Sequence, residues 1–243
     1  MSSRRLAYLD ALGVDVYVGR SSTTAAVPEE VPPGVPPRAA PPDVAERTEA
    51  SLDWDSLRAA VAACTRCSLC ETRTQTVFGV GDPHAKWMFI GEAPGADEDR
   101  QGEPFVGRAG QLLTSMLRAL GFGRGDVYIA NVLKCRPPGN RDPKPEEALQ
   151  CRGYLERQIE LVSPELIVAV GRIAAQNLLA TDTALARLRG KVHALGARGW
   201  PLVVTYHPAY LLRSPGEKRK AWQDLLFARD VHRRIVAGER IVP

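Results

Sequence analysis

The chain has 243 residues, of which 44% are hydrophobic and 25% charged, and its formal net charge is +4. This length holds one sizeable α/β core, and no apolar run approaches the roughly 20 residues that a membrane helix needs. The N-terminus lacks the charged, apolar and small-residue order of a signal peptide. We therefore expect a cytoplasmic protein without a membrane partner.

Charge divides the chain into an acidic tail and a basic remainder. Residues 1–50 contain five Lys or Arg and seven Asp or Glu, so residues 51–243 contain 27 basic and 21 acidic residues. A basic domain is compatible with a polyanionic partner, because each neutralised phosphate releases counterions. Surplus basic residues also serve solubility alone.

The first fifty residues are predicted to lie outside the folded domain, which we place at residues 51–243. Residues 4–18 put leucines at helical spacing, and seven prolines follow between Pro28 and Pro42. A segment so rich in proline favours extended, solvated chain. We therefore predict a short N-terminal segment at 1–20 and a flexible linker at 21–50. The linker is a simple tether, or it carries residues 4–18 as a docking peptide for a protein partner.

Strands and helices are predicted to alternate along the folded domain. Residues 52–64 form a helix that delivers the first cysteine. Apolar runs typical of buried strands occupy residues 87–90, 127–132, 166–170 and 202–205, and helical patterns occupy residues 109–120, 145–162, 172–180 and 217–236. This order indicates an α/β fold whose mostly parallel sheet is covered by helices on both faces.

Five cysteines occupy the chain, which is an odd number. Cys64, Cys67 and Cys70 form C-x2-C-x2-C, and Cys135 and Cys151 follow near the middle. In a reducing compartment this count argues against a disulfide framework and favours metal binding or catalysis. Four thiolates would complete either a zinc site or a [4Fe–4S] cluster. The residues alone leave both open.

Polar residues follow three of the predicted strands. Glu92 lies directly after the strand at 87–90, Asn131 lies at the end of the next strand, and His207 follows the last. Open α/β sheets bind ligands at the carboxyl ends of their strands, so these three side chains are predicted to converge on one crevice. An Asn offers a donor and an acceptor together, which suits a base edge. Phe105, among turn residues, either stacks on a flat ligand or packs under its loop.

Four motifs, with four of the cysteines, resemble the family 4 uracil-DNA glycosylases: GEAPGADED, PFVGRAGQLL, NVLKCRPPGNRDP and YHPAYLLR. The resemblance extends from about Cys64 to the C-terminus. It implies a three-layer α/β/α sandwich around a short, mostly parallel four-stranded sheet. It also implies a structural [4Fe–4S] cluster on Cys64, Cys67, Cys135 and Cys151, with Cys70 as a departure from the family pattern. The implied activity is removal of uracil from single- or double-stranded DNA by a monomer.

The resemblance implies how the base is held. Phe105 would stack on the flipped uracil, Asn131 would hydrogen-bond its Watson–Crick edge, and His207 would donate to uracil O2 as negative charge grows there. Ala93 and Gly95 would line the pocket where the best-known branch of the superfamily has a water-positioning Asp and a thymine-blocking Tyr.

The resemblance does not determine which residue positions the attacking water. Glu92, Glu98 and Asn140 are all candidates to position the attacking water, and Glu98 is also our candidate for rejecting thymine. Basic side chains along the same motifs are predicted to contact the DNA backbone: Arg108, Lys134, Arg136, Arg141 and Arg213. For Lys134, Arg136 and Arg141, the alternative is a solvated charged loop.

Two other functions are weighed against excision of uracil. An iron–sulfur relative that forms a covalent adduct would need an Arg-rich insertion with a histidine, and the stretch VLKCRPPGNRDP after Asn131 has neither. A non-catalytic iron–sulfur protein that only binds DNA would not require Glu92, Asn131 and His207 together.

Overall fold

The computed structural model describes residues 48–239. The predicted segment 1–20 and most of the predicted linker lie outside the described residues. Residues 48–50 do not behave as linker, because a short 3-10 helix, η1 (Thr48–Ser51), buries Glu49, which pairs with Arg66. A glutamate buried by an ion pair leaves no hydrophobic signal, so the sequence places the boundary slightly late.

The sheet has six strands rather than the predicted four. Their order in the sheet is β1-β3-β2-β4-β6-β5. Their bounds are β1 (Val80–Gly81), β2 (Trp87–Gly91), β3 (Tyr128–Asn131), β4 (Leu166–Val170), β5 (His193–Leu195) and β6 (Trp200–Thr205). The four predicted strands form the parallel centre, while β1 and β5 are antiparallel edges. The edges escape prediction because they are two and three residues long and only partly buried.

Helices flank the sheet at nearly the predicted positions. The α-helices are α2 (Trp54–Ala62), α3 (Ala96–Gln101), α4 (Arg108–Leu120), α5 (Pro145–Val162), α6 (Arg172–Leu179), α7 (Leu185–Leu188), α8 (Pro208–Arg213) and α9 (Lys218–Val236). Further 3-10 turns are η2 (Ser68–Glu71), η3 (Arg124–Asp126), η4 (Pro138–Asn140) and η5 (Pro215–Glu217). The prediction missed the short α3, α7 and α8, which lack a full helical period of apolar residues. No helix among these is long and apolar enough to cross a membrane.

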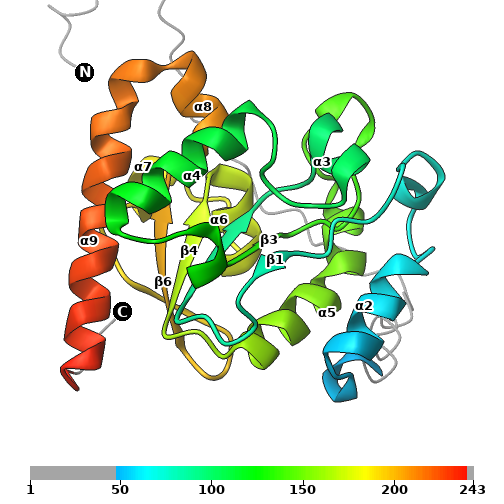
Figure 1. Ribbon diagram of the computed structural model, residues 1–243, viewed down its shortest axis with the longest axis horizontal. Coiled ribbons are helices and arrows are strands. Elements are labelled where there is room, and N and C mark those ends of the chain that lie inside the picture. The colour runs from blue at the N-terminus through cyan, green and yellow to red at the C-terminus, as the bar shows by residue number, and fades with distance from the viewer. Residues whose placement is uncertain (1–47, 240–243) are drawn as a thin grey trace, which may run out of the picture. The chain divides into compact units, whose positions relative to one another are not determined.

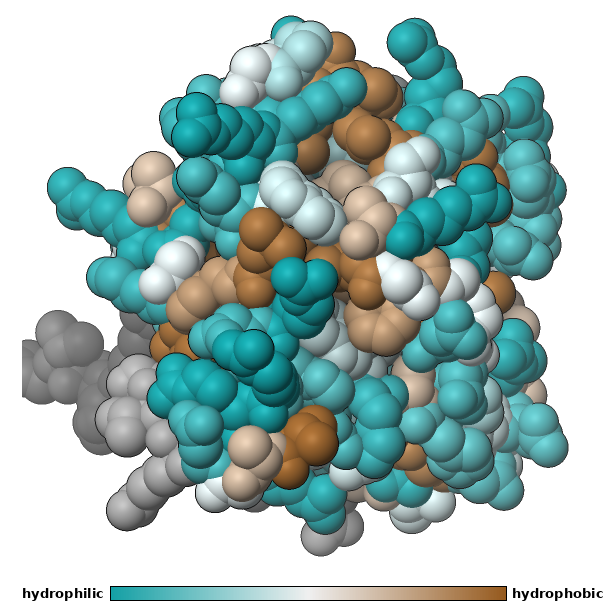
Figure 2. Space-filling view, turned by 60° about the vertical axis from the view of Figure 1, so that its left-hand side comes forward, coloured by the Kyte–Doolittle hydropathy of each residue, from teal (hydrophilic) through white to brown (hydrophobic). Residues whose placement is uncertain are grey.

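Helices cover both faces of the sheet, as predicted (Figure 1). Alternate residues of one strand point to opposite faces, so Met88 and Ile90 pack with α5 and α6 while Phe89 packs with α4 and α9. Polar side chains cover most of the surface seen in Figure 2, and the apolar ones there form separate small patches. The apolar core therefore consists of two layers, one on each side of a completely buried central sheet.

Strand register aligns the carboxyl ends of the central strands. Gly91 at the end of β2 pairs with Asn131 at the end of β3, and Val170 at the end of β4 pairs with Thr205 at the end of β6. The loops that follow these four strands therefore meet along one edge of the sheet, and they carry the site described next.

Candidate functional site

A cavity of about 720 Å³ opens along this edge of the sheet. Its walls come from the loops after β2, β3, β4 and β6, and it brings together the three strand-end residues predicted to converge, Glu92, Asn131 and His207. The volume lies within the range of ligand-binding pockets. The convergence predicted from the sequence is confirmed.

Phe105 forms one wall of the cavity in a left-handed backbone conformation. Its φ is +56°, which is uncommon for a bulky residue. Arg124 holds this turn by donating hydrogen bonds to the carbonyl oxygens of Pro104 (2.7 Å) and Phe105 (3.1 Å). The absent side chain of Gly110 allows the turn to lie against α4, since a Cβ there would be 1.8 Å from the Phe105 carbonyl oxygen. Phe105 is thus fixed by its surroundings.

Asn131 presents an unsatisfied acceptor beside this aromatic ring. Its side chain is 2% exposed, and Oδ1 has no hydrogen-bond partner among residues 48–239. A Cβ atom on Gly91 would lie 2.4 Å from Phe105 Cζ and 2.5 Å from Asn131 Oδ1, so only glycine leaves room for both groups. Buried polar atoms are almost always paired in proteins. An orphaned one in a cavity therefore indicates a place for a ligand's donor.

His207 faces the Phe105 ring, with the two ring centroids 5.6 Å apart. Its Nδ1 accepts a hydrogen bond from the Ala209 N–H at 3.1 Å, at the start of α8. Burial, assisted by the nearby charge of Arg213, lowers the pKa of His207 to about 4. The imidazole is therefore neutral near pH 7, and because Nδ1 is the acceptor, its proton is on Nε2.

Glu92 also lines the cavity, directly after β2. Burial raises the pKa of its carboxyl to about 7, with a smaller contribution from the negative charge of Asp142 and an opposing one from Arg172. Arg172 and Asp142 form an ion pair of 2.8 Å. A carboxyl group with a pKa near 7 is half ionised at neutral pH, which is the property of a general base working there.

Glu98 organises the loop between β2 and α4. Its Oε1 accepts hydrogen bonds from the N–H groups of Val106 (2.9 Å) and Gly107 (3.0 Å), and its Oε2 accepts one from Gly95 (3.1 Å). Both carboxylate oxygens are thus used to join the start of α3 to the Phe105 turn. The predictions that Glu98 handles water or rejects thymine stay predictions, and its contacts indicate a positioning role.

The other residues predicted to lie in the pocket are found on the cavity walls. Ala93, Gly95 and Asn140 all line it. Asn140 is exposed with a φ of +56°, and its Oδ1 accepts a hydrogen bond of 2.7 Å from Arg136 Nε. The amide nitrogen of Asn140 is the group left to face a ligand or water.

Comparison with known proteins agrees with this geometry. The Uracil DNA glycosylase superfamily model matches residues 78–226. A type-4 uracil-DNA glycosylase of Archaeoglobus fulgidus is 49% identical over 167 residues, which cover 66% of this chain and 84% of that protein. The chain belongs to the type-4 family of this superfamily. Two further type-4 uracil-DNA glycosylases are similar. That of Thermotoga maritima is 46% identical over 63% of this chain and 80% of its own length. That of Sulfurisphaera tokodaii is 39% identical over 73% of this chain and 84% of its own length.

The basic residues that the family resemblance assigned to the DNA backbone differ in their surroundings. Arg108 and Arg213 are exposed at the cavity rim. Arg136 is half-buried, and Arg141, also half-buried, donates to the Glu147 carboxylate at 2.8 Å. These four stay predictions.

The prediction that Lys134 contacts the DNA backbone is wrong. The side chain is 1% exposed, and its Nζ donates to the Asn131 carbonyl oxygen at 2.8 Å and to Gln158 Oε1 at 2.6 Å. A group so buried contacts no phosphate. Lys134 instead fixes the end of β3, where this type-4 chain presents Asn131.

All five cysteines line a second, small cavity behind this strand end. Cys64, Cys67, Cys70, Cys135 and Cys151 surround it. Arg73, which also lines it, donates a hydrogen bond of 3.0 Å to Cys135 Sγ. Among residues 48–239, no group of three or more His, Cys, Asp or Glu side chains is placed to hold a single metal ion. Soft thiol groups from three segments nevertheless line one cavity, beside the cationic side chains of Arg66 and Arg73, which suit thiolates.

Three residues that support or line the cavity escaped prediction from the sequence. Arg124, in η3, holds the Phe105 turn from nineteen residues later in the chain, and no local pattern marks this contact. Tyr206 and Tyr210 both line the cavity and flank His207 in the motif YHPAYLLR. Their position beside a predicted site residue was the available signal.

Proposed function

We propose that this chain hydrolyses the N-glycosidic bond of deoxyuridine in DNA, releasing free uracil and leaving an abasic site. The observation that carries the proposal is the buried Oδ1 of Asn131, which has no hydrogen-bond partner among the described residues and lies near the Phe105 ring, which also faces His207. Uracil is flat and carries an N3–H donor between two carbonyl acceptors, so it matches all three groups. A base inside a duplex cannot reach them and must be extruded.

Asn131 would select uracil over cytosine. Its Oδ1 accepts from the uracil N3–H, whereas cytosine offers an acceptor at N3 and would leave the buried oxygen unpaired. A site built to pair a ligand's hydrogen-bonding group rejects analogues that lack it, because buried polar groups are then left unsatisfied.

His207 would stabilise the leaving group. As the C–N bond breaks, its electron pair passes to uracil, and negative charge develops on O2. The Nε2–H of a neutral imidazole donates a hydrogen bond to that oxygen, and its contribution grows with the charge, so the transition state is favoured over the bound substrate. The low pKa of His207 keeps this donor neutral over the physiological range.

Glu92 is the best-placed of the three candidates for the attacking water. Glu98 already accepts three backbone hydrogen bonds, and the Asn140 oxygen accepts one from Arg136. The Glu92 carboxylate, with its pKa near 7, would accept a proton from water as oxygen attacks C1′ of the sugar. The departing uracil anion would then take a proton from solvent.

The cysteine cavity is proposed to hold a [4Fe–4S] cluster on Cys64, Cys67, Cys135 and Cys151, which would supply structural stability rather than chemistry. Four thiolates can hold a cluster of this kind. All five cysteines line one cavity, which supports the proposal. Holding the cluster would join the segment after α2 to the loop after β3.

The DNA backbone is proposed to lie along the cavity rim, against Arg108 and Arg213, with Arg136 and Arg141 on the loop after β3. The cytoplasmic location, the association with the nucleoid through DNA, the monomeric state and the N-terminal protein partner stay predictions.

The experiment that tests the activity uses a labelled single strand with one deoxyuridine, followed by hot alkali, which cleaves abasic sites. We expect cleavage at the uracil position and none in the matched thymine strand. Folded, fully loaded protein that leaves the uracil strand intact contradicts the proposal, as does equal cleavage of both strands.

A further inference from the structure

Two tyrosines form an aromatic stack beside the uracil-binding end of the cavity. Tyr206 follows β6 directly and Tyr210 lies in α8, and their ring centroids are 5.2 Å apart with planes inclined by 20°. Both line the cavity, and Tyr210 is 37% exposed. Neither is required by the chemistry of Glu92, Asn131 and His207, so their exposed aromatic surface is left without a role.

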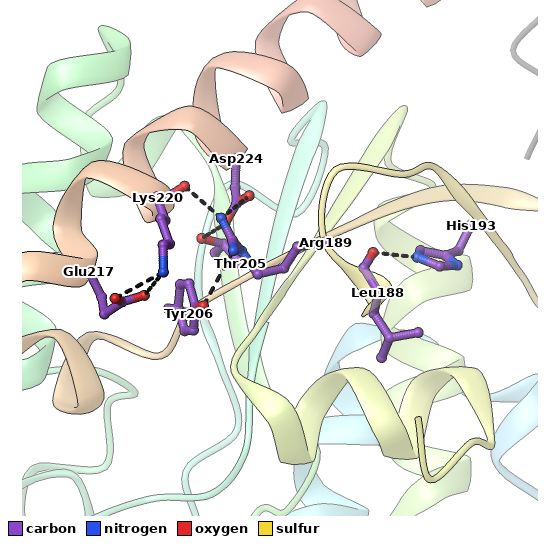
Figure 3. Close-up of polar contacts among 8 residues, drawn as sticks. All are labelled: Leu188, Arg189, His193, Thr205, Tyr206, Glu217, Lys220 and Asp224. Atoms are coloured by element: carbon purple, nitrogen blue, oxygen red, sulfur yellow. Dashed lines mark hydrogen bonds and ion pairs between the residues drawn. The ribbon is translucent and has the colours of Figure 1, made fainter. Parts of the chain in front are cut away.

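A buried ion pair braces this stack (Figure 3). The Arg189 guanidinium lies over the Tyr206 ring, with Cζ 4.4 Å from the centroid, and its Nη1 donates to the Tyr206 hydroxyl at 3.3 Å. Asp224 on α9 accepts hydrogen bonds from Arg189 Nε (2.7 Å) and Nη2 (2.8 Å), and a third from Thr205 Oγ1 (3.0 Å). Two more side chains in the view, Glu217 and Lys220, pair beside it.

The bracing fixes the Tyr206 ring before any ligand arrives. Arg189 is held by two hydrogen bonds to one carboxylate, which is the rigid geometry of a guanidinium pair. A ring fixed in advance loses little conformational entropy when a ligand stacks on the assembly. Tyr210 stacks on the fixed Tyr206 ring, so its own ring is also held in place, and part of its surface stays accessible.

The cavity has room for more than one base. Its volume of about 720 Å³ lies in the upper part of the range for drug-sized ligands, and a single pyrimidine between Phe105, Asn131 and His207 would occupy one end. Arg213, three residues after Tyr210, lines the same cavity, is exposed and offers positive charge for an adjoining phosphate. Aromatic surface alternating with cations is the pattern by which proteins bind single-stranded DNA.

We propose that Tyr210, supported by Tyr206 and the Arg189–Asp224 pair, is a stacking site for the unpaired base next to the flipped uracil. The proposal rests on the proposed function, because the site is reached only by a strand whose uracil occupies the adjoining pocket. It predicts that part of the affinity comes from a neighbouring base of any identity, because every base has a flat face.

The test compares Tyr210→Ala, Tyr210→Phe and the unaltered protein on three short single strands containing one deoxyuridine. One strand has ordinary neighbours, the second has a stable abasic residue on the 5′ side, and the third has it on the 3′ side. Tyr210 is exposed, so neither variant is expected to disturb folding, and circular dichroism checks this.

On the ordinary strand, Tyr210→Ala is expected to lower kcat/KM by roughly 5- to 150-fold, mostly through KM, and Tyr210→Phe to change it little. On one of the two strands with an abasic neighbour, the kcat/KM of the unaltered protein should fall by a similar factor. On that strand, the unaltered protein and Tyr210→Ala should then have the same kcat/KM. A Tyr210→Ala loss that is equal on all three strands, or no loss on any, overturns the stacking site. Failure of the unaltered protein to excise uracil from any strand would instead contradict the proposed function.

Discussion

The two ends of the segment from Asn131 to Cys135 face two cavities with opposite characters. At one end, Asn131 Oδ1 is buried with no hydrogen-bond partner among residues 48–239, and His207, whose Nδ1 accepts from Ala209 N–H, lines the same cavity. At the other end, Cys135 Sγ already accepts a hydrogen bond from Arg73, and four further thiols surround the space. The first cavity thus keeps a buried acceptor available for a polar ligand, and the second is lined by thiol groups, which are donors of one soft type.

Lys134 connects these two regions. It lines the cysteine cavity, yet its Nζ binds the Asn131 carbonyl oxygen. Lys134 therefore forms part of the cysteine cavity and also fixes the end of β3, which carries Asn131. The cysteine cavity and the Asn131 end of β3 are thus joined through Lys134, and substitutions in the two cavities are expected to have separable effects.

The largest effect is expected from Cys135→Ala. Losing a buried ligand should abolish cluster binding, so the purified variant should lack iron and visible absorbance and have a lower Tm. The matched variant Cys70→Ala should keep both iron and colour if Cys70 is not a ligand. Iron analysis and absorbance spectroscopy measure the difference, and equal loss in the two variants would show that the ligand set includes Cys70.

His207→Ala should lower kcat by about 10²-fold or more, because one preorganised transition-state donor is worth that much elsewhere. Iron content and Tm should stay unchanged, which separates the catalytic cavity from the cysteine cavity. His84→Ala, at an exposed position, is the control and should retain full activity. A normal turnover in His207→Ala would remove this residue from the mechanism.

The pH dependence of kcat/KM should have its acid limb near pH 7 and should follow Glu92. The pKa of this carboxyl is raised to about 7, so the active carboxylate is lost as pH falls through that value, and the rate at pH 6 should be roughly tenfold below the plateau. His207, whose pKa is lowered to about 4, stays neutral throughout this window. In Glu92→Gln the limb should disappear along with most of the activity. Persistence of the limb would assign it to another group.

The smallest effects should distinguish a buried lysine from an exposed arginine. Arg213→Ala should reduce the slope of log affinity against log salt by about 0.7 for a single strand, because one phosphate contact is lost. Lys134→Met should lower Tm and leave that slope unchanged. Fluorescence anisotropy with labelled DNA over a salt series measures both. A reduced slope in Lys134→Met would restore it as a phosphate contact.

The sequence by itself determined the central architecture and the three polar residues that meet in the larger cavity. The four inner strands are continuous apolar runs because both faces of a parallel strand are buried, and Glu92, Asn131 and His207 stand out as polar residues where such runs end. The order of strands and helices then required them to meet at one edge.

Only the tertiary structure decided which polar groups are used internally and which remain for a ligand. Lys134 and Arg136 look alike in the sequence, yet one is buried under the strand end and the other is half-exposed. Arg124 supports Phe105, and Arg189 supports Tyr206, through contacts between residues far apart in the chain. Periodicity encodes which side of an element is buried, but the partner of a given polar side chain depends on how distant elements pack, and no local pattern contains that information.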